Sequence, residues 1–129
     1  MPKPIAVGLG ATDALRGAAP ANDAIDRAYL SRFTLGNADL EREVLELFAA
    51  QLPVYLEQLR SAHDAKSWRN AAHTIKGSAA AVGAQRLSNI ARMAEQVDFA
   101  STQRGSALAA IQEAADEASR CVASLFAAG

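Results

Sequence analysis

The chain has 129 residues, of which 13 are Lys or Arg and 14 are Asp or Glu, giving a formal net charge of −1. This length is typical of one domain with its own core, and the near-neutral charge does not favour a nucleic acid or an anionic membrane as a partner. Half of the residues are hydrophobic but only 5% are aromatic, and this composition indicates closely packed helices rather than sheets.

The first part of the chain is predicted to be a leader followed by a short helix. Residues 1–22 are rich in glycine and proline, which predicts a flexible leader, and a helical domain is predicted over residues 23–129. Apolar side chains at helical spacing between residues 24 and 35 predict a helix that covers one part of the bundle. Gly36 is expected to end it.

A long second helix is predicted from a cap at Asn37 to about His63, with a kink near Pro53. The expected apolar positions on this helix are Leu40, Val44, Leu47, Leu56 and Leu59. Apolar side chains near its start, and on the short helix before it, are expected to pack in the core. The alternative is that they border a docking surface; these side chains are Tyr29, Phe33 and Leu40.

Three further helices are predicted, over residues 64–83 with an Asp64 cap, over residues 84–97, and over residues 102–126 with a cap at Ser101 or Thr102. Short connections between helices make sequential neighbours antiparallel. The predicted fold is therefore all-α, an up-and-down antiparallel four-helix bundle with a short N-terminal cover helix.

The helix over residues 64–83 separates into an apolar stripe and a polar face. At about 100° per residue, all members of the stripe lie within about 40° of Trp68, and they are Trp68, Ala72, Ile75, Ala79 and Val82. His73 lies about 140° away from Trp68. The same outward arc carries Arg69, Lys76, Gly77 and Ala80. We therefore expect His73 to be exposed beside a cation and very small residues.

An exposed histidine is usually only a solvated polar residue, but Gly77 favours a chemical role for His73. A glycine inside a helix costs about 1 kcal/mol relative to alanine, and the i, i+4 spacing leaves open space next to the imidazole. Neutral imidazole is a competent nucleophile, and its phosphorylation gives a phosphoramidate that can pass the phosphoryl group on. Lys76 is placed to approach a dianionic ring substituent.

The segment His73-Thr74-Ile75-Lys76-Gly77-Ser78-Ala79-Ala80-Ala81-Val82-Gly83 resembles the signature of histidine-containing phosphotransfer (HPt) domains, and the resemblance covers roughly residues 25–120. It implies that His73 is phosphorylated, that Lys76 steadies the phosphoryl group, and that Gly77 leaves room for a receiver domain. Arg69 and Ala80 are expected to border this binding face.

In HPt domains a polar residue of the following helix often lies near the histidine. The candidates here are Gln85, Arg86, Asn89 and Arg92, of which Arg92 is the choice. Ser78 flanks the core and is expected to have a structural role.

By this resemblance the chain is a phosphocarrier of a multistep two-component phosphorelay, which accepts phosphoryl from a receiver aspartate and passes it to another receiver. The expected partners are response-regulator receiver domains and a hybrid histidine kinase. The chain has no ATP-binding lobe and no Mg²⁺ carboxylate cluster, so it is expected to have no kinase activity and no cofactor, with Mg²⁺ supplied by the receiver. A cytoplasmic monomer is expected; the lone cysteine, Cys121, and the lack of a membrane-length apolar run favour this location.

Three alternatives differ from this function. One is a helical adaptor that docks receivers without accepting phosphate. Another is a bundle of the chemotaxis-kinase type, which requires an ATP-binding domain on another chain. The third is a dimeric histidine-kinase hairpin, which is disfavoured because Thr74, and not an acidic residue, follows His73.

Overall fold

The computed structural model describes residues 24–127, and within this range the chain contains helices and no strands. The predicted leader, residues 1–22, lies outside the described residues. The helices are α1 (Arg27–Thr34), α2 (Ala38–Arg60), α3 (Ala65–Ala81), α4 (Gln85–Glu95) and α5 (Gln103–Ala127). The predicted all-helical fold is therefore confirmed.

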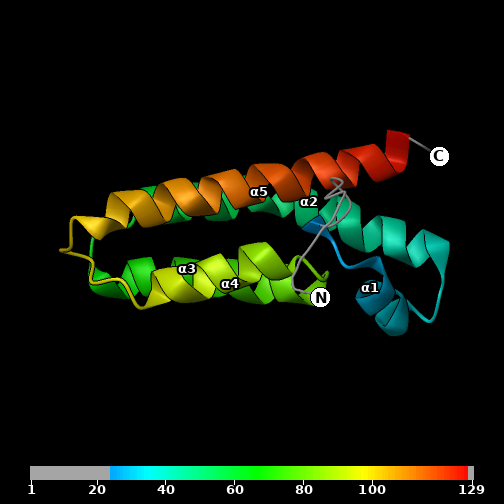
Figure 1. Cartoon of the computed structure of the whole chain (residues 1–129), viewed down its shortest axis with the longest axis horizontal. Helices are drawn as coiled ribbons and strands as arrows, with labels where there is room; N and C mark the ends of the chain where they lie inside the picture. Colours follow the sequence, from blue (N-terminus) through cyan, green and yellow to red (C-terminus); the bar gives the residue numbers. More distant parts are fainter. Residues whose placement is uncertain (1–23, 128–129) are drawn as a thin grey trace, which may run out of the picture.

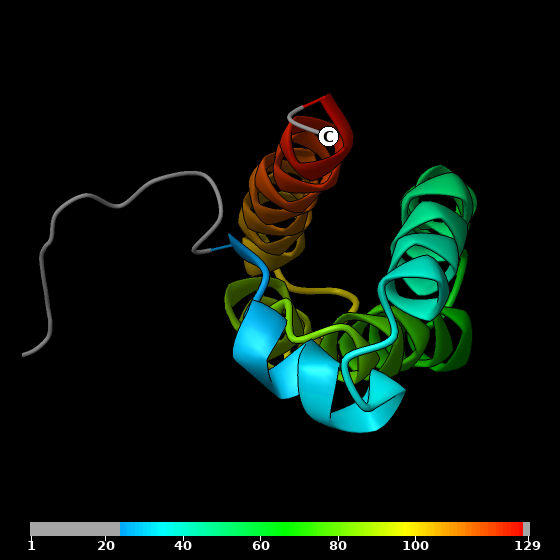
Figure 2. The ribbon, with the colours of Figure 1, turned by 90° about the vertical axis from the view of Figure 1, so that its right-hand side faces the viewer.

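Helices α2 to α5 run alternately up and down and lie side by side (Figure 1). Each packs against its neighbours in the order α2, α3, α4, α5 and back to α2, so the four helices enclose one core. Viewed from the end, α1 lies across the bundle near the α3–α4 turn (Figure 2). The up-and-down bundle with an N-terminal cover helix is the predicted topology.

Side-chain caps mark the starts of α2 and α3, as Asp26 does for α1. The Asn37 side chain accepts a hydrogen bond from the Leu40 backbone N–H at 3.0 Å, as predicted. Asp64 forms a capping box with Ser67 at the start of α3. Both caps satisfy backbone donors that the first helical turn leaves without partners.

Two predicted features of the first two helices need adjustment. Helix α1 ends at Thr34, because Leu35 already has a left-handed φ of 54°. Helix α2 ends at Arg60 rather than at His63, although it continues through the exposed Pro53 without a break, as predicted.

The predicted core stripe of α3 is confirmed, and all five of its members are buried: Trp68, Ala72, Ile75, Ala79 and Val82. The Trp68 indole also donates a buried hydrogen bond of 2.9 Å from Nε1 to the Ala94 carbonyl on α4. This bond satisfies the only polar atom of a large apolar side chain. It also fixes the last turn of α4 against the start of α3.

The predicted core positions of α2 are partly wrong. Leu40 and Leu47 are 41% and 61% exposed, because at about 100° per residue they do not share the stripe of Leu56 and Leu59. The buried stripe of α2 consists of Leu45, Phe48, Leu52, Leu56 and Leu59. Phe33 is likewise 65% exposed, so core packing was the wrong interpretation for Phe33 and Leu40.

Gly83 ties the cover helix to the turn between α3 and α4. Its φ is +79°, and its carbonyl accepts a 2.8 Å hydrogen bond from the Asp26 backbone N–H. A Cβ at this position would lie 2.7 Å from the Asp26 carbonyl oxygen. Glycine is therefore needed both for the left-handed backbone and for the close approach of the segment that caps α1.

Candidate functional site

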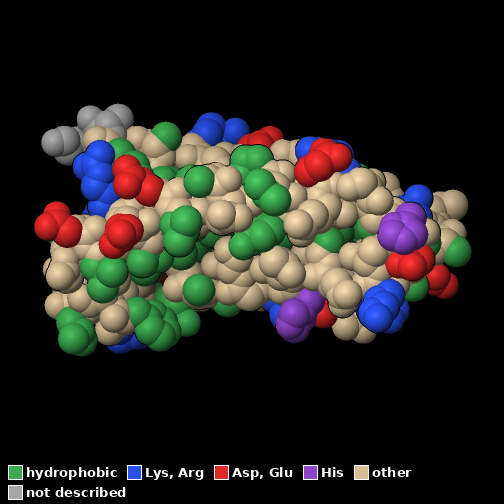
Figure 3. Space-filling model, turned by 180° about the vertical axis from the view of Figure 1, so that it is seen from behind, with side chains coloured by type: hydrophobic (Ala, Val, Ile, Leu, Met, Phe, Trp, Pro, Cys, Tyr) green, Lys and Arg blue, Asp and Glu red, His purple; other side chains and the backbone are tan. Residues whose placement is uncertain are grey.

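His73 lies near the middle of α3, on the side opposite the buried stripe, and its side chain is 67% exposed. Both histidines lie on the surface of the molecule (Figure 3). The orientation of His73 follows from the packing of Ala72 and Ile75, its neighbours along the helix, which are completely buried. The exposed position predicted from the helical spacing is therefore observed.

The carboxylate of Glu95, at the end of α4, contacts both His73 and Lys76. Glu95 Oε2 lies 3.3 Å from His73 Nδ1, and Glu95 Oε1 lies 2.8 Å from Lys76 Nζ. The Glu95 and Lys76 side chains are only 16% and 29% exposed, so the ion pair is largely shielded from water. His73, Lys76 and Glu95 together form what we call the His–Lys–Glu cluster.

The lysine keeps Glu95 ionised. The hydrogen bond from Lys76 is the main cause that lowers the pKa of the Glu95 carboxyl, burial opposes it, and His73 lowers the pKa further. At neutral pH the carboxylate is therefore negatively charged and forms an ion pair with the Lys76 ammonium.

Contacts between α3 and α4 hold the cluster in place. Ser88 of α4 donates a hydrogen bond from Oγ to the Lys76 carbonyl at 3.1 Å. The bond from Trp68 to the carbonyl of Ala94 fixes the residue that directly precedes Glu95. Two side-chain bonds between the helices thus set the position of Glu95 relative to His73.

Open space lies on the other side of His73. A Cβ added at Gly77 would have no heavy atom within 4 Å apart from its chain neighbours and the backbone of its own helix. Arg69, one turn before His73, is exposed, and Ala80 is half-buried. The face around His73 is therefore flat at Gly77, and its internal packing does not require a glycine there.

A shallow groove between α2 and α3 lies next to Gly77 along the chain, since Ser78 is part of its wall. Its lining residues are Val44, Leu47, Phe48, Gln51, Tyr55, Ser78, Ala81 and Val82, and we call it the α2–α3 groove. Hydrophobic side chains lie along this face of the molecule and gather at the end where α1 lies (Figure 3). Ser78 is half-buried at this position.

The structure corrects the predicted polar neighbour of His73 on α4. Arg92 was the choice, but the side chain that contacts His73 is Glu95, and Arg92 contacts Asn89 instead, at 3.4 Å. A hairpin turn centred on Gly83 brings residues near 93 opposite residue 73, and this register would have directed attention to the end of α4. Which residue near 93 contacts His73 depends on the face of α4 that it occupies. Glu95 directly follows the buried Ala94.

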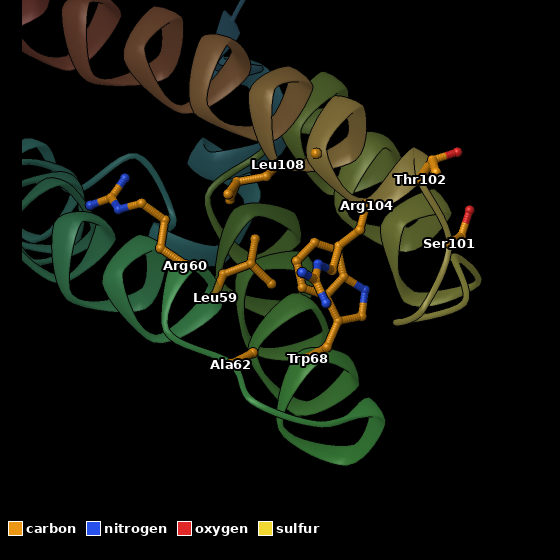
Figure 4. A pocket seen from close by; sticks show the side chains of 9 residues that line it. Leu59, Arg60, Ala62, Trp68, Ser101, Thr102, Arg104 and Leu108 are labelled. Carbon is orange, nitrogen blue, oxygen red and sulfur yellow. The ribbon is translucent and has the colours of Figure 1, made fainter.

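A second hollow lies at the opposite end of the bundle, where α5 begins (Figure 4). Its walls include Leu59, Trp68, Arg104 and Leu108. The Arg104 guanidinium is already engaged, because it stacks 4.1 Å from the centre of the Phe99 ring and donates to the Phe99 carbonyl. Arg60, the other charged residue in its wall, pairs with Glu57 at 3.1 Å, so neither arginine of this hollow is without a partner.

Metal-binding clusters and membrane-spanning helices are both absent from residues 24–127. In that range no three His, Cys, Asp or Glu side chains are grouped so that they could hold a metal ion. No helix of the described part of the chain is long and apolar enough to cross a membrane.

Comparison with known protein families identifies the chain. The family model of the Hpt domain matches residues 43–128, about two thirds of the sequence, and this range includes every member of the His–Lys–Glu cluster. Comparisons with curated proteins and with solved structures gave no match. Because the family match spans most of the helical bundle, the chain belongs to the Hpt domain family, whose members carry out histidine phosphotransfer in phosphorelays and interact with receiver-type partners.

Proposed function

We propose that the chain carries a phosphoryl group on Nε2 of His73, taking it from the aspartate of one receiver domain and passing it to another. The observation that supports this most is the contact of His73 Nδ1 with Glu95, because it occupies one ring nitrogen of a side chain that is 67% exposed and so favours Nε2 as the acceptor. A phosphorylated aspartate needs a nucleophile that it can approach in line. The open space at Gly77 allows that approach.

In the forward step the Nε2 lone pair attacks phosphorus. The bond between phosphorus and the aspartate oxygen breaks, and its electron pair leaves with the receiver carboxylate. Mg²⁺ held by the receiver stabilises the phosphoryl oxygens, and Lys76 adds one cation from this chain. Onward transfer is the reverse reaction with a second receiver.

The exposed apolar surface supports a protein as the phosphoryl donor and acceptor. Leu47 is 61% exposed at the α2–α3 groove, and Phe33 and Leu40 are exposed near the start of α2. Exposed large apolar side chains that gather on one face are typical of an interaction surface. We place the receiver over Gly77 and this groove, with Arg69, Ala80 and Arg92 at the rim of the contact.

The source of the phosphoryl group in this proposal is a hybrid histidine kinase, through its receiver domain, and the carrier works as a cytoplasmic monomer. An adaptor that only docks receivers is the alternative. It is disfavoured because docking alone does not need a shielded carboxylate that contacts both the histidine and the lysine.

Transfer from a phosphorylated receiver tests this function. The wild-type chain should gain label that is lost in acid and stable in base, as expected for a phosphoramidate. His73→Gln should gain none while keeping its helical content, because the residue lies off the core stripe.

His63→Gln is the matched control, because His63 is also exposed and lies beside an acidic side chain, Asp64. It should be labelled as fast as the wild type. Label that persists in His73→Gln, or that survives acid, would overturn the assignment.

A further inference from the structure

A second apolar stripe lies on the surface of α2, apart from the stripe that faces the core. Its members are alternately four and three residues apart, so they share one side of the helix. They are Leu40, Val44, Leu47, Gln51 and Val54. Leu40, Leu47 and Val54 are 41%, 61% and 50% exposed, so the described part of the chain leaves them largely uncovered. A row of exposed apolar side chains on one helix is typical of a surface that another segment covers.

The predicted leader joins the bundle close to the α2–α3 groove, which this stripe borders. The backbone N–H of Asp26 donates a hydrogen bond of 2.8 Å to the Gly83 carbonyl. Val82, the residue before Gly83, is part of the groove wall. Residues 1–23 precede the described part of the chain, so the leader begins its path at the end of the bundle where the groove lies.

One segment of the leader has side chains of the kind that this groove could hold. Residues 5–9 alternate an apolar side chain with a small residue, and the apolar ones are Ile5, Val7 and Leu9. In an extended chain alternate side chains point to the same side, and five residues span about 13 Å. The α2 side of the groove extends over about three helical turns, or about 16 Å. The segment therefore matches the groove in length and in polarity.

Charge favours this segment over a second copy of the chain. Lys3 is the only charged side chain among residues 1–12, and the exposed Glu43 lies one turn before Leu47 on the same side of α2. Two copies of α2 packed against each other would instead bring acidic side chains together. The acidic residues of this helix are Asp39, Glu41, Glu43, Glu46 and Glu57, against the basic Arg42 and Arg60.

We propose that residues 5–9 bind in the α2–α3 groove and compete there with the receiver domain. This inference rests on the proposed function, which places the receiver over Gly77 and the same groove. A bound segment covers Leu47 and lies against Ser78, the neighbour of Gly77. The contact is autoinhibitory, because a receiver must displace the segment before it can reach His73.

Tethering makes a weak contact sufficient. Residues 10–23 connect the segment to the bundle, and a coil of about 14 residues has an end-to-end distance of about 20 Å. This distance is close to the length of the groove, so the local concentration of the segment is on the order of 1 mM. A dissociation constant between about 1 mM and 0.1 mM then weakens the apparent affinity for a receiver by about twofold to tenfold.

Disulfide formation in the full chain tests the contact without any receiver. Val7→Cys combined with Gln51→Cys places one thiol on the segment and one in the groove, while the completely buried Cys121 is retained. In a glutathione redox buffer the effective concentration of this pair should be at least about tenfold higher than that of a control pair. The control is Val7→Cys with Asp116→Cys, since Asp116 is exposed on α5 and does not line the groove.

Adding Ile5→Asp and Leu9→Asp to the first pair should lower its effective concentration to that of the control. Equal disulfide formation in the two pairs would overturn the proposal. A disulfide between two chains that replaces the internal one at low protein concentration would assign the groove to a second copy, and would overturn it as well.

A kinetic measurement tests the competition. Ile5→Asp with Leu9→Asp in the full chain should lower the KM for a phosphorylated receiver by about twofold to tenfold and leave kcat unchanged. Ala18→Asp with Ala19→Asp adds the same charge outside the segment and should leave both constants at their wild-type values. An unchanged KM in the first variant would contradict the proposal. If the wild type exchanges phosphoryl with no receiver while the disulfide pairs still differ, the proposed function fails and the contact of the segment with the groove stands.

Discussion

Substitution of Gly77 separates the folding role of this residue from its functional role, because the two predict opposite effects. A Cβ at Gly77 has no heavy atom outside its own helix within 4 Å. Alanine therefore fits without strain and should stabilise the fold by up to about 1 kcal/mol through its better helix propensity. For a domain of this size that gain raises the melting temperature by about 4 °C or slightly more.

The effect on transfer should run the other way. Side chains of increasing length at Gly77 occupy the space beside His73, and a displacement of about 1 Å of the reacting atoms costs about a hundredfold in rate. We expect Gly77→Ala to transfer more slowly than the wild type, and Gly77→Gln and Gly77→Leu to lose a hundredfold or more.

Melting temperature and transfer from a phosphorylated receiver should be measured on the same preparations. Gly105 supplies the control, because it is also helical, a Cβ there also meets nothing within 4 Å, and it lies in α5 at the opposite end of the bundle. Gly105→Gln should leave transfer unchanged. A Gly77→Gln variant that transfers as fast as the wild type would refute the placement of the receiver on this face.

Three other predictions follow from the same structure. Lys76→Ala should slow transfer by about tenfold or more, because a cation near the phosphoryl oxygens is lost. Lys66→Ala, on the first turn of α3, is the control and should not slow it. Equal transfer rates for Lys76→Ala and the wild type would show that Lys76 is not part of the site. Gly83→Ala should lower the free energy of unfolding by about 1–2 kcal/mol in urea denaturation, because of its left-handed φ and its 2.7 Å approach to Asp26; unchanged stability would refute the packing of α1. The pKa of Glu95 is lowered, so its ionised form should stabilise the fold at pH values above the ordinary carboxyl pKa of 4.5. This stabilisation should be lost as the pH falls through the lower pKa of the folded state. The difference in the free energy of unfolding between the wild type and Glu95→Gln should therefore be constant near neutral pH and shrink in acid.

The fold was predictable because helical spacing, caps and short connections all indicate the same topology. The α3 stripe is an example, since five apolar residues within one narrow arc can only face a core. The pattern of α2 was less informative, because this helix carries more apolar residues than the core accepts. Leu47 and Leu40 belong to a surface, and their exposure depends on which side the neighbouring helices occupy.

The candidate site was only half predictable. His73, Lys76 and Gly77 lie on one helix, so their relative positions follow from its geometry. Glu95 comes from another helix, and its contact depends on the register between α3 and α4, which the Trp68 and Ser88 hydrogen bonds fix. Periodicity within one helix carries no information about such a register.

The most direct test of the central claim is to locate the phosphorus atom on the phosphorylated protein. With ¹⁵N-labelled histidine, a coupling between phosphorus and nitrogen identifies the bonded atom. The structure predicts a coupling to Nε2 of His73, because Nδ1 contacts Glu95. A coupling to Nδ1 of His73, or to either ring nitrogen of His63, would contradict the account.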